Sequence, residues 1–247
     1  MPKVKEIFDF LNSIADFSLQ EDWDNSGMLV GDFDAEVCKA AVVLDITGDA
    51  VKKAKQNGVN LIVSHHPVIF SPQKSFTKGN IAYELAVEGI SAICCHTPLD
   101  IARGGTNDTL ARLLGFDVTT GENPILRFAE IEPVDAQRLA QHIASTLKTT
   151  VRYSDAEKTI KKVAICTGAG CSLIEEAGEV DAFITGDASH HNILDALENG
   201  ISVFAAGHYE TENPVVPVIK NLLEEKFPSI ETIIIEQENP VKAISFE

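Results

Sequence analysis

The chain has 247 residues, and its 20 basic and 37 acidic side chains give a net charge of −17. This length suits one large α/β domain or two small similar ones, and no apolar run in the sequence is long enough to cross a bilayer. A surface this negative repels the phosphates of DNA and RNA, so we expect neither nucleic acid nor membrane among the partners.

The first part of the chain alternates helices with strands. Val4, Ile7 and Leu11 fall on one stripe of an N-terminal helix. After this helix, the pattern predicts strands over 39–46, 59–64 and 90–95 and helices over 49–56 and 81–88. Single helices between strands indicate right-handed βαβ units and a mostly parallel sheet.

Residues 122–160 have a different pattern. Residues 125–131 alternate like an antiparallel strand, 135–147 read as an amphipathic helix, and 151–153 are extended. We therefore expect a short α+β insertion with a small sheet of its own. The predicted organisation is a first α/β half over 1–121, the insertion over 122–160 and a second α/β half over 161–247.

The second half repeats the first. GVNLIVSHHP (58–67) aligns with EVDAFITGDA (179–188) without a gap, and 84–100 aligns with 195–212 with one extra residue. In both copies a Gly-Ile-Ser strand start leads to a histidine and, four residues later, a carboxylate. The fold class is therefore α/β with two similar βαβ-type halves from an internal duplication, although parallel strands also resemble one another by chance.

Histidines and carboxylates follow the predicted strands directly. Open parallel sheets bind ligands at the carboxyl ends of their strands, so we expect these loops to meet at one place. Imidazole and carboxylate are ligands of iron, zinc and manganese, and five ligands exceed what one tetrahedral zinc needs. The sequence thus predicts two divalent metal ions held by His65, His66, Asp100, His208 and Glu212.

His96 is the candidate general acid or base, with metal ligation or support of a ligand as its alternatives. Asp100 and Glu212 could instead cap helices. The pair His190-His191 is expected to open the helix over 192–198, with ligation as the lesser alternative, and His142 is expected at the surface.

Two loops could contact a substrate. Gly104 to Asn107 precedes a helix, where free N–H groups favour an anion, and the alternative is a glycine turn with Thr106 or Asn107 as the helix cap. The loop from Trp23 to Gly27 could line the site with its indole, and the alternative is a turn with a core tryptophan.

Five cysteines, an odd number without a CxxC pair, argue against a disulfide framework. We expect them to be reduced and mostly buried in a cytoplasmic protein, with a thiolate metal site as the alternative.

Six motifs in order, over nearly the whole chain, resemble the family of GTP cyclohydrolase 1 type 2 homologs, also called the NIF-three-like family: WDNSGMLVG (23–31), SHHP (64–67), HTPLD (96–100), GGTND (104–108), TGD (185–187) and GHYETE (207–212). The resemblance implies a toroidal homohexamer with metal pairs facing an internal cavity. It places the family's ligands on the five residues named above, with Glu212 as the bridge. Longer members carry a separate middle domain, whose place the short insertion takes here.

The expected function is that of a metal-dependent hydrolase acting on a small molecule such as a nucleotide. If the substrate is GTP, a metal-bridging hydroxide would open its purine ring. The alternative is a non-catalytic metal-handling protein or a hexameric scaffold or regulatory protein.

Overall fold

The computed structural model describes residues 1–242 and 244. The chain forms two compact units, Met1–Ala102 with Val216–Glu247, and Arg103–Val215. The unit boundaries differ from the segments expected from the sequence, because the C-terminal strand pairs in the first unit. The expected second half ends in residues that include 243 and 245–247, which lie outside the described part.

The first unit contains a five-stranded sheet in the order β1-β4-β3-β2-β11. Strands β4, β3, β2 and β11 are parallel to their neighbours, and β1 runs antiparallel at one edge. Apolar residues fill these strands because both faces are covered. The strands are β1 (Gly27–Val30), β2 (Lys39–Val43), β3 (Leu61–Ser64), β4 (Ser91–Cys94) and β11 (Glu231–Ile234).

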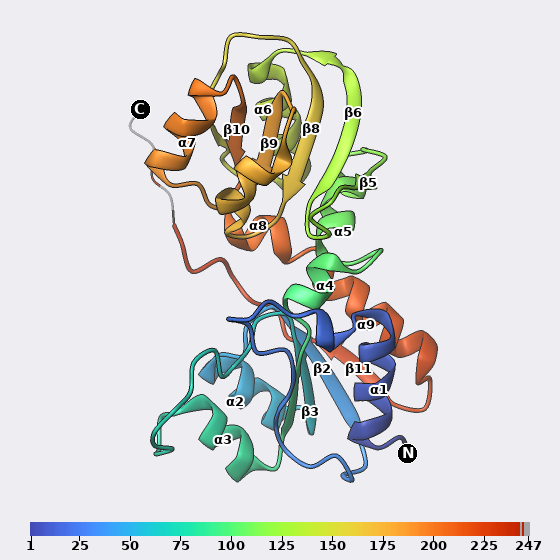
Figure 1. Cartoon of the computed structure of the whole chain (residues 1–247). Helices are drawn as coiled ribbons and strands as arrows, with labels where there is room; N and C mark the ends of the chain where they lie inside the picture. Colours follow the sequence, from blue (N-terminus) through green and yellow to red (C-terminus); the bar gives the residue numbers. More distant parts are fainter. Residues whose placement is uncertain (243, 245–247) are drawn as a thin grey trace. The chain divides into compact units, whose positions relative to one another are not determined.

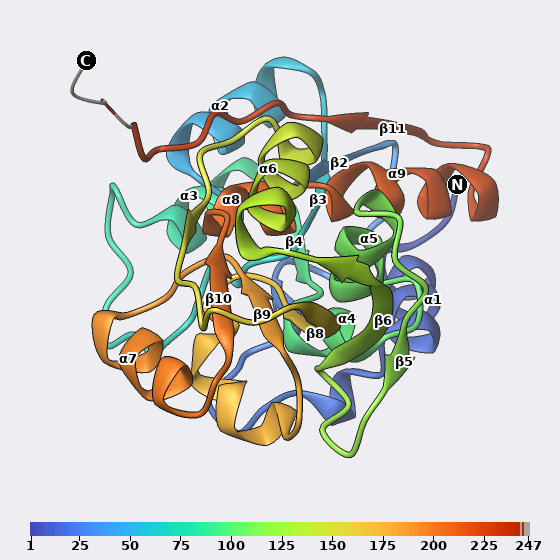
Figure 2. The same cartoon turned by 90° about the horizontal axis from the view of Figure 1, so that it is seen from above.

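Helices cover both faces of this sheet. Helices α2 and α3 contribute Ala50, Val51, Ala54 and Leu85 to a core on one face, and α1 and α9 lie on the other (Figures 1 and 2). The bounds are α1 (Val4–Ile14), η1 (Phe17–Leu19), α2 (Gly48–Gln56), α3 (Ile81–Glu88), α4 (Thr97–Ile101) and α9 (Val215–Lys226). The N-terminal helix and both βαβ helices were predicted from the hydrophobic pattern.

The second unit contains a six-stranded sheet in the order β5-β6-β8-β9-β10-β7. The three strands β8, β9 and β10 are parallel, whereas β6 and β7 pair antiparallel at either side of them. The strands are β5 (Thr119–Thr120), β6 (Arg127–Val134), β7 (Arg152–Tyr153), β8 (Ile160–Cys166), β9 (Ala182–Thr185) and β10 (Ser202–Ala205).

The expected separate sheet of the insertion is wrong. The segment 122–160 supplies β6 and β7, which pair with β8 and β10 of the parallel strands. Unpaired N–H and C=O groups at the edges of a three-stranded sheet favour pairing with a neighbouring strand. The insertion therefore extends the sheet of the second unit instead of folding apart from it.

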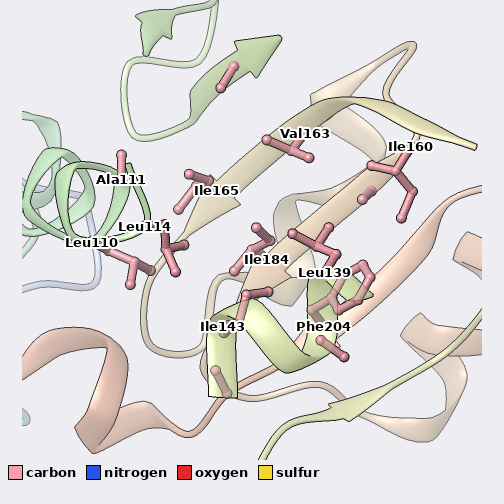
Figure 3. Packing of buried hydrophobic residues seen from close by; sticks show 14 of the residues in the cluster. Leu110, Ala111, Leu114, Leu139, Ile143, Ile160, Val163, Ile165, Ile184 and Phe204 are labelled. Atoms are coloured by element: carbon pink, nitrogen blue, oxygen red, sulfur yellow. The ribbon is translucent and has the colours of Figure 1, made fainter. Parts of the chain in front are cut away.

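Two helices cover one face of this second sheet. Leu110 of α5, Leu114 at its C-terminal cap, and Leu139 and Ile143 of α6 point toward the apolar side chains of the strands, such as Ile184 (Figure 3). The segments η2 and α7 also pack against the parallel strands. The bounds are α5 (Thr106–Leu113), α6 (Ala136–Leu147), η2 (Gly170–Ala177), α7 (His190–Glu198) and α8 (His208–Glu212).

The two units have the same arrangement of strands. Three parallel strands, β2-β3-β4 in the first unit and β8-β9-β10 in the second, are followed in the sheet by an antiparallel strand, β1 or β7. Within each run, α4 or α8 follows the third strand. This common order is the arrangement that a duplicated βαβ unit would produce. It places the expected ligands at equivalent strand ends. In the described part of the chain, the helices are too short or too polar to cross a bilayer.

Candidate metal centre

The first unit gathers three histidines and a carboxylate at the ends of two neighbouring parallel strands. His65 and His66 follow β3, His96 precedes α4 after β4, and Asp100 lies in α4. Ring nitrogens of the three histidines all lie within 4.8 Å of one another. We call these four residues the first ligand set.

His65 is fully buried, and its ring orientation is fixed by the backbone. Its Nδ1 lies 2.9 Å from the carbonyl oxygen of Cys95. Because a carbonyl only accepts hydrogen bonds, Nδ1 carries the proton and Nε2 presents its lone pair. Nε2 lies 3.7 Å from Oδ1 of Asp100. Two ligand atoms that are each about 2.1 Å from one ion can lie at most ~4.2 Å apart, so this separation is short enough for a shared metal.

Carboxylates orient the other two imidazoles of the first ligand set. Nδ1 of His66 lies 2.8 Å from Asp45, and Nδ1 of His96 lies 2.7 Å from Asp24. Metal-binding histidines usually donate their second ring N–H to a carboxylate or a carbonyl, which fixes the tautomer and the ring plane. All three histidines therefore have the support that metal ligands have.

Asp24 is held by several donors. Its oxygens accept hydrogen bonds from the backbone of Asn25 and from the backbone and hydroxyl of Thr97, in addition to His96. Burial raises the pKa of this carboxyl, but the hydrogen bonds from His96 and Thr97 outweigh burial and hold the pKa well below its usual range. Asp24 is therefore ionised and acts only as an acceptor.

The second unit has a smaller group on α8. His208 and Glu212 are one helical turn apart and therefore share a face. Nε2 of His208 lies 3.0 Å from Oε2 of Glu212, and its Nδ1 lies 2.8 Å from Oδ2 of Asp187. We call His208 and Glu212 the second ligand set. The ring of His208 thus has the same carboxylate support as His66 and His96.

Gly168 provides the space for the second ligand set. It follows β8 in a left-handed conformation with φ 59°, and a Cβ atom there would collide with Oε1 of Glu212 and lie 3.2 Å from Nε2 of His208. Its N–H donates to the Thr211 hydroxyl, and its carbonyl accepts from Asp187 N–H. The loop is therefore fixed against the carboxylate.

Gly168→Ala is expected to weaken metal binding by roughly 10- to 100-fold, the range seen when a group that orients a ligand is lost. The added methyl displaces the Glu212 carboxylate. Metal titration of the two proteins measures this loss. Gly178→Ala is the matched control, because Gly178 has a similar φ of 62° and open space around its Cβ position. Equal affinities in the two variants would contradict a specific role for Gly168.

The structure decides several of the alternatives left open by the sequence. The N-cap residue of α5 is Gly105, so the prediction that Thr106 or Asn107 caps this helix is wrong. Asn107 is buried and bonds to the backbone of Ile125 and Thr167. The N–H of Gly104 donates to Asp108, so a carboxylate of the chain takes the place of an external anion there.

Trp23 is not a core residue. The residue is 56% exposed, and the centroid of its ring lies 5.8 Å from that of His96.

The exposed pair His190-His191 forms the first turn of α7 after Ser189, which caps the helix. Exposed His142 lies on α6, with Nε2 2.8 Å from the Leu114 carbonyl oxygen.

The cysteines are all free, as expected, and all but Cys38 are buried. Burial raises the pKa of the Cys95 thiol to about 12 and that of Cys94 well above its usual value. Both thiols next to the first ligand set are therefore protonated at neutral pH, which favours imidazole and carboxylate as the ligands.

Known proteins resemble the chain over nearly its full length. The family described as Duf34/NIF3 (NGG1p interacting factor 3) matches residues 2–240. The chain belongs to this family. A "GTP cyclohydrolase 1 type 2 homolog" from Clostridium acetobutylicum is 32% identical to this Duf34/NIF3 protein and covers 99% of both chains. A "GTP cyclohydrolase 1 type 2" from Helicobacter pylori is 32% identical over 90% of this chain and 92% of its own.

Solved structures show that the fold is that of the Duf34/NIF3 family. The crystal structure of a Staphylococcus aureus hypothetical protein matches with a TM-score of 0.89 and 26% identity, over 98% of this chain and 99% of its own. The family assignment and the fold expected from the six motifs are thereby confirmed.

The donor sets of this Duf34/NIF3 chain fit a divalent metal. The first ligand set combines one buried and two half-buried imidazoles with a carboxylate. The second set places an imidazole nitrogen 3.0 Å from a carboxylate oxygen. Nitrogen and oxygen donors of this kind suit zinc, iron and manganese. The structure groups His65, His66 and Asp100 in one unit and His208 with Glu212 in the other. That these five residues share one metal pair stays a prediction.

Three functional residues were missed or left in doubt by sequence reasoning. Asp45 lies just beyond β2, next to β3 in the sheet, and the rule about carboxyl ends of strands would have found it. Asp24 was seen only as part of a turn. Gly168 carries no functional group. Only its position just after the end of the strand β8 could have pointed to it.

Proposed function

We propose that this chain is a metal-dependent hydrolase in which His65, His66, Asp100, His208 and Glu212 bind two divalent ions of iron, zinc or manganese. The strongest observation in favour of this proposal is that each histidine of the two ligand sets has a hydrogen-bond partner at Nδ1. In four imidazoles Nδ1 is held by a carboxylate or a carbonyl, which leaves Nε2 for a ligand. The bridging role that the resemblance gives to Glu212 is part of the proposal.

Bound metal ions would lower the pKa of a coordinated water toward ~7 and polarise the substrate. The chain itself supplies proton transfer. Because Asp24 is ionised and accepts from Nδ1 of His96, that nitrogen carries the proton in the neutral ring, and Nε2 can take a proton from water or return it to a leaving group. His96 is therefore the proposed general acid or base, and its position beside His65 and His66 also suits a ligand.

The proposed substrate is a small molecule with a hydrolysable ring or ester bond, and a nucleotide is the first choice. The name of the Helicobacter pylori relative says that it is a GTP cyclohydrolase. Hydrolytic opening of the purine ring of GTP is accordingly the reaction to examine first. Free cysteines suit the reducing cytoplasm, where we place the protein. We also infer a toroidal homohexamer, whose mass light scattering would measure.

Turnover is expected to require bound metal. The purified chain, loaded in turn with iron, zinc and manganese, would be assayed against nucleotides, phosphoesters and cyclic amides, with metal content measured on the same samples. Dialysis against a chelator should abolish turnover, and returning the metal should restore it. Chelated protein that turns over a substrate at the full rate would refute the proposal.

A metal-handling protein predicts another pattern in the same experiment: two exchangeable ions, no turnover of any substrate class, and transfer of metal to an apo-enzyme. His96 favours catalysis, because it places a further titratable group beside the five proposed ligands, which storage of an ion does not require.

A further inference from the structure

Two large aromatic side chains lie exposed beside the first ligand set. Trp23 is 56% exposed and Phe70 is 52% exposed. Their ring centroids are 5.9 Å apart, and each ring also lies near His96, at 5.8 Å for Trp23 and 6.3 Å for Phe70. Aromatic rings normally bury their apolar faces, so a pair left open next to a candidate catalytic histidine suggests a ligand.

Hydrogen bonds fix the loops that carry the two rings. The side-chain amide of Asn25 donates to the carbonyl of Ile69 at 2.6 Å, which links the loop of Trp23 to the loop of Phe70. Asp24, next to Trp23, binds His96 and Thr97. The pair is therefore positioned relative to His96 before any ligand arrives, which lowers the entropic cost of binding.

The loop of Phe70 differs in charge from the rest of the chain. Residues 67–80 contain Lys74 and Lys78 and no aspartate or glutamate, although the whole chain has a net charge of −17. A cationic loop suits a ligand that carries an anionic group. On the other side, Glu21 and Asp22 precede Trp23, so the anionic part of the ligand is expected toward the lysines.

We propose that Trp23 and Phe70 form an aromatic platform that stacks against the planar heteroaromatic ring of the substrate and presents it to His96. This inference rests on the proposed function, which makes the first ligand set part of the active site. It adds the residues that would bind the ring of the substrate. Stacking on aromatic side chains tolerates different bases, because each base has a π-face. The platform therefore selects planar rings as a class, with the anionic group directed toward Lys74 and Lys78.

The chain contains a single tryptophan, so its fluorescence reports on the platform directly. Guanosine and GTP are expected to quench the emission of Trp23, and inorganic tripolyphosphate, which has no ring, is expected to leave it unchanged. Equal quenching by tripolyphosphate would overturn the proposal. The titration is run on chelated and on metal-loaded protein and needs no turnover.

Calorimetric binding of GTP tests the side chains themselves. Trp23→Ala and Phe70→Ala should each weaken binding by roughly 5- to 100-fold, the range for loss of one stacking partner. Trp23→Phe keeps an aromatic face and should stay within about 3-fold of the original chain on the same grounds. Phe76→Ala is the matched control, because Phe76 lies in the same loop and is 51% exposed, and it takes no part in the ring contacts among Trp23, Phe70 and His96.

Three outcomes would overturn the platform: unchanged GTP affinity in Trp23→Ala and Phe70→Ala, equal loss in Phe76→Ala, or a change in oligomer mass in Trp23→Ala. The last would place Trp23 in an interface between copies of the chain. Failure of the hydrolase proposal looks different, since quenching by guanosine and the variant pattern would persist in a protein without turnover.

Discussion

Replacing His208 by alanine is expected to reduce turnover by at least about 1000-fold and to remove at least one metal ion per chain. A loss of this size corresponds to about 4 kcal/mol of transition-state stabilisation, which is within reach of a lost metal ion. The side chain is 38% exposed, so its removal leaves no large cavity and the second unit should stay folded. Metal analysis, turnover and thermal unfolding on the same preparation measure the three effects.

The matched control is His190→Ala. His190 lies in the same unit, is exposed at the start of α7 and, among the described residues, belongs to no group of potential metal ligands. It should keep both ions and full turnover. Turnover that survives His208→Ala would refute this residue as part of the catalyst.

His65→Ala makes the same test in the first ligand set. A shared metal pair predicts that variants in either set lower turnover to a similar extent. Independent ions in each unit predict instead that His208→Ala leaves the metal of His65 in place at full occupancy. His65 is fully buried, so its variant must also be compared for thermal unfolding without metal.

The fold was largely accessible from the sequence, because strong local patterns agree with it. The helix over 81–88 ends at Gly89, which adopts a left-handed conformation with φ 66°, and the structure has that helix at the same residues. The helix expected over 135–147 is also present, with Asp135 as its N-cap. The pairing of β6 with β8 could not be inferred, because the alternation of a strand does not say which neighbour it pairs with.

The grouping of the candidate ligands in the first unit was predictable for a similar reason. Histidines and carboxylates at the ends of parallel strands must emerge at one edge of a sheet, and the first unit shows this for His65 and His96. The residues that orient these rings were harder to identify. Asp45 and Asp24 act through hydrogen bonds to side chains 21 and 72 positions away. A spacing of that kind leaves no local pattern in a single sequence.

No pattern in the sequence indicated that Arg127 stabilises the fold, although its buried position in the structure indicates a large contribution. It is 1% exposed at the start of β6. Its guanidinium pairs with the Asp108 carboxylate of α5 and donates to the carbonyl oxygens of Pro124, at 2.6 Å, and of Ile125, at 3.2 Å. One side chain thus fixes the first turn of α5 against the loop that leads into β6.

Arg127→Met is expected to lower the free energy of unfolding of the second unit by about 3 to 5 kcal/mol. Methionine fills much of the same volume, but Asp108 loses its ion pair, and carbonyl groups beside the core lose their donor. For a chain of this size the thermal midpoint should fall by roughly 6 to 20 °C. Arg138→Met is the control, because Arg138 is 79% exposed on α6 and pairs with Asp135 across 3.4 Å, so it should change stability by less than about 0.5 kcal/mol. If both variants unfold at the same temperature, the buried guanidinium does not hold α5 to β6, and the apolar core of α5 and α6 must do so alone.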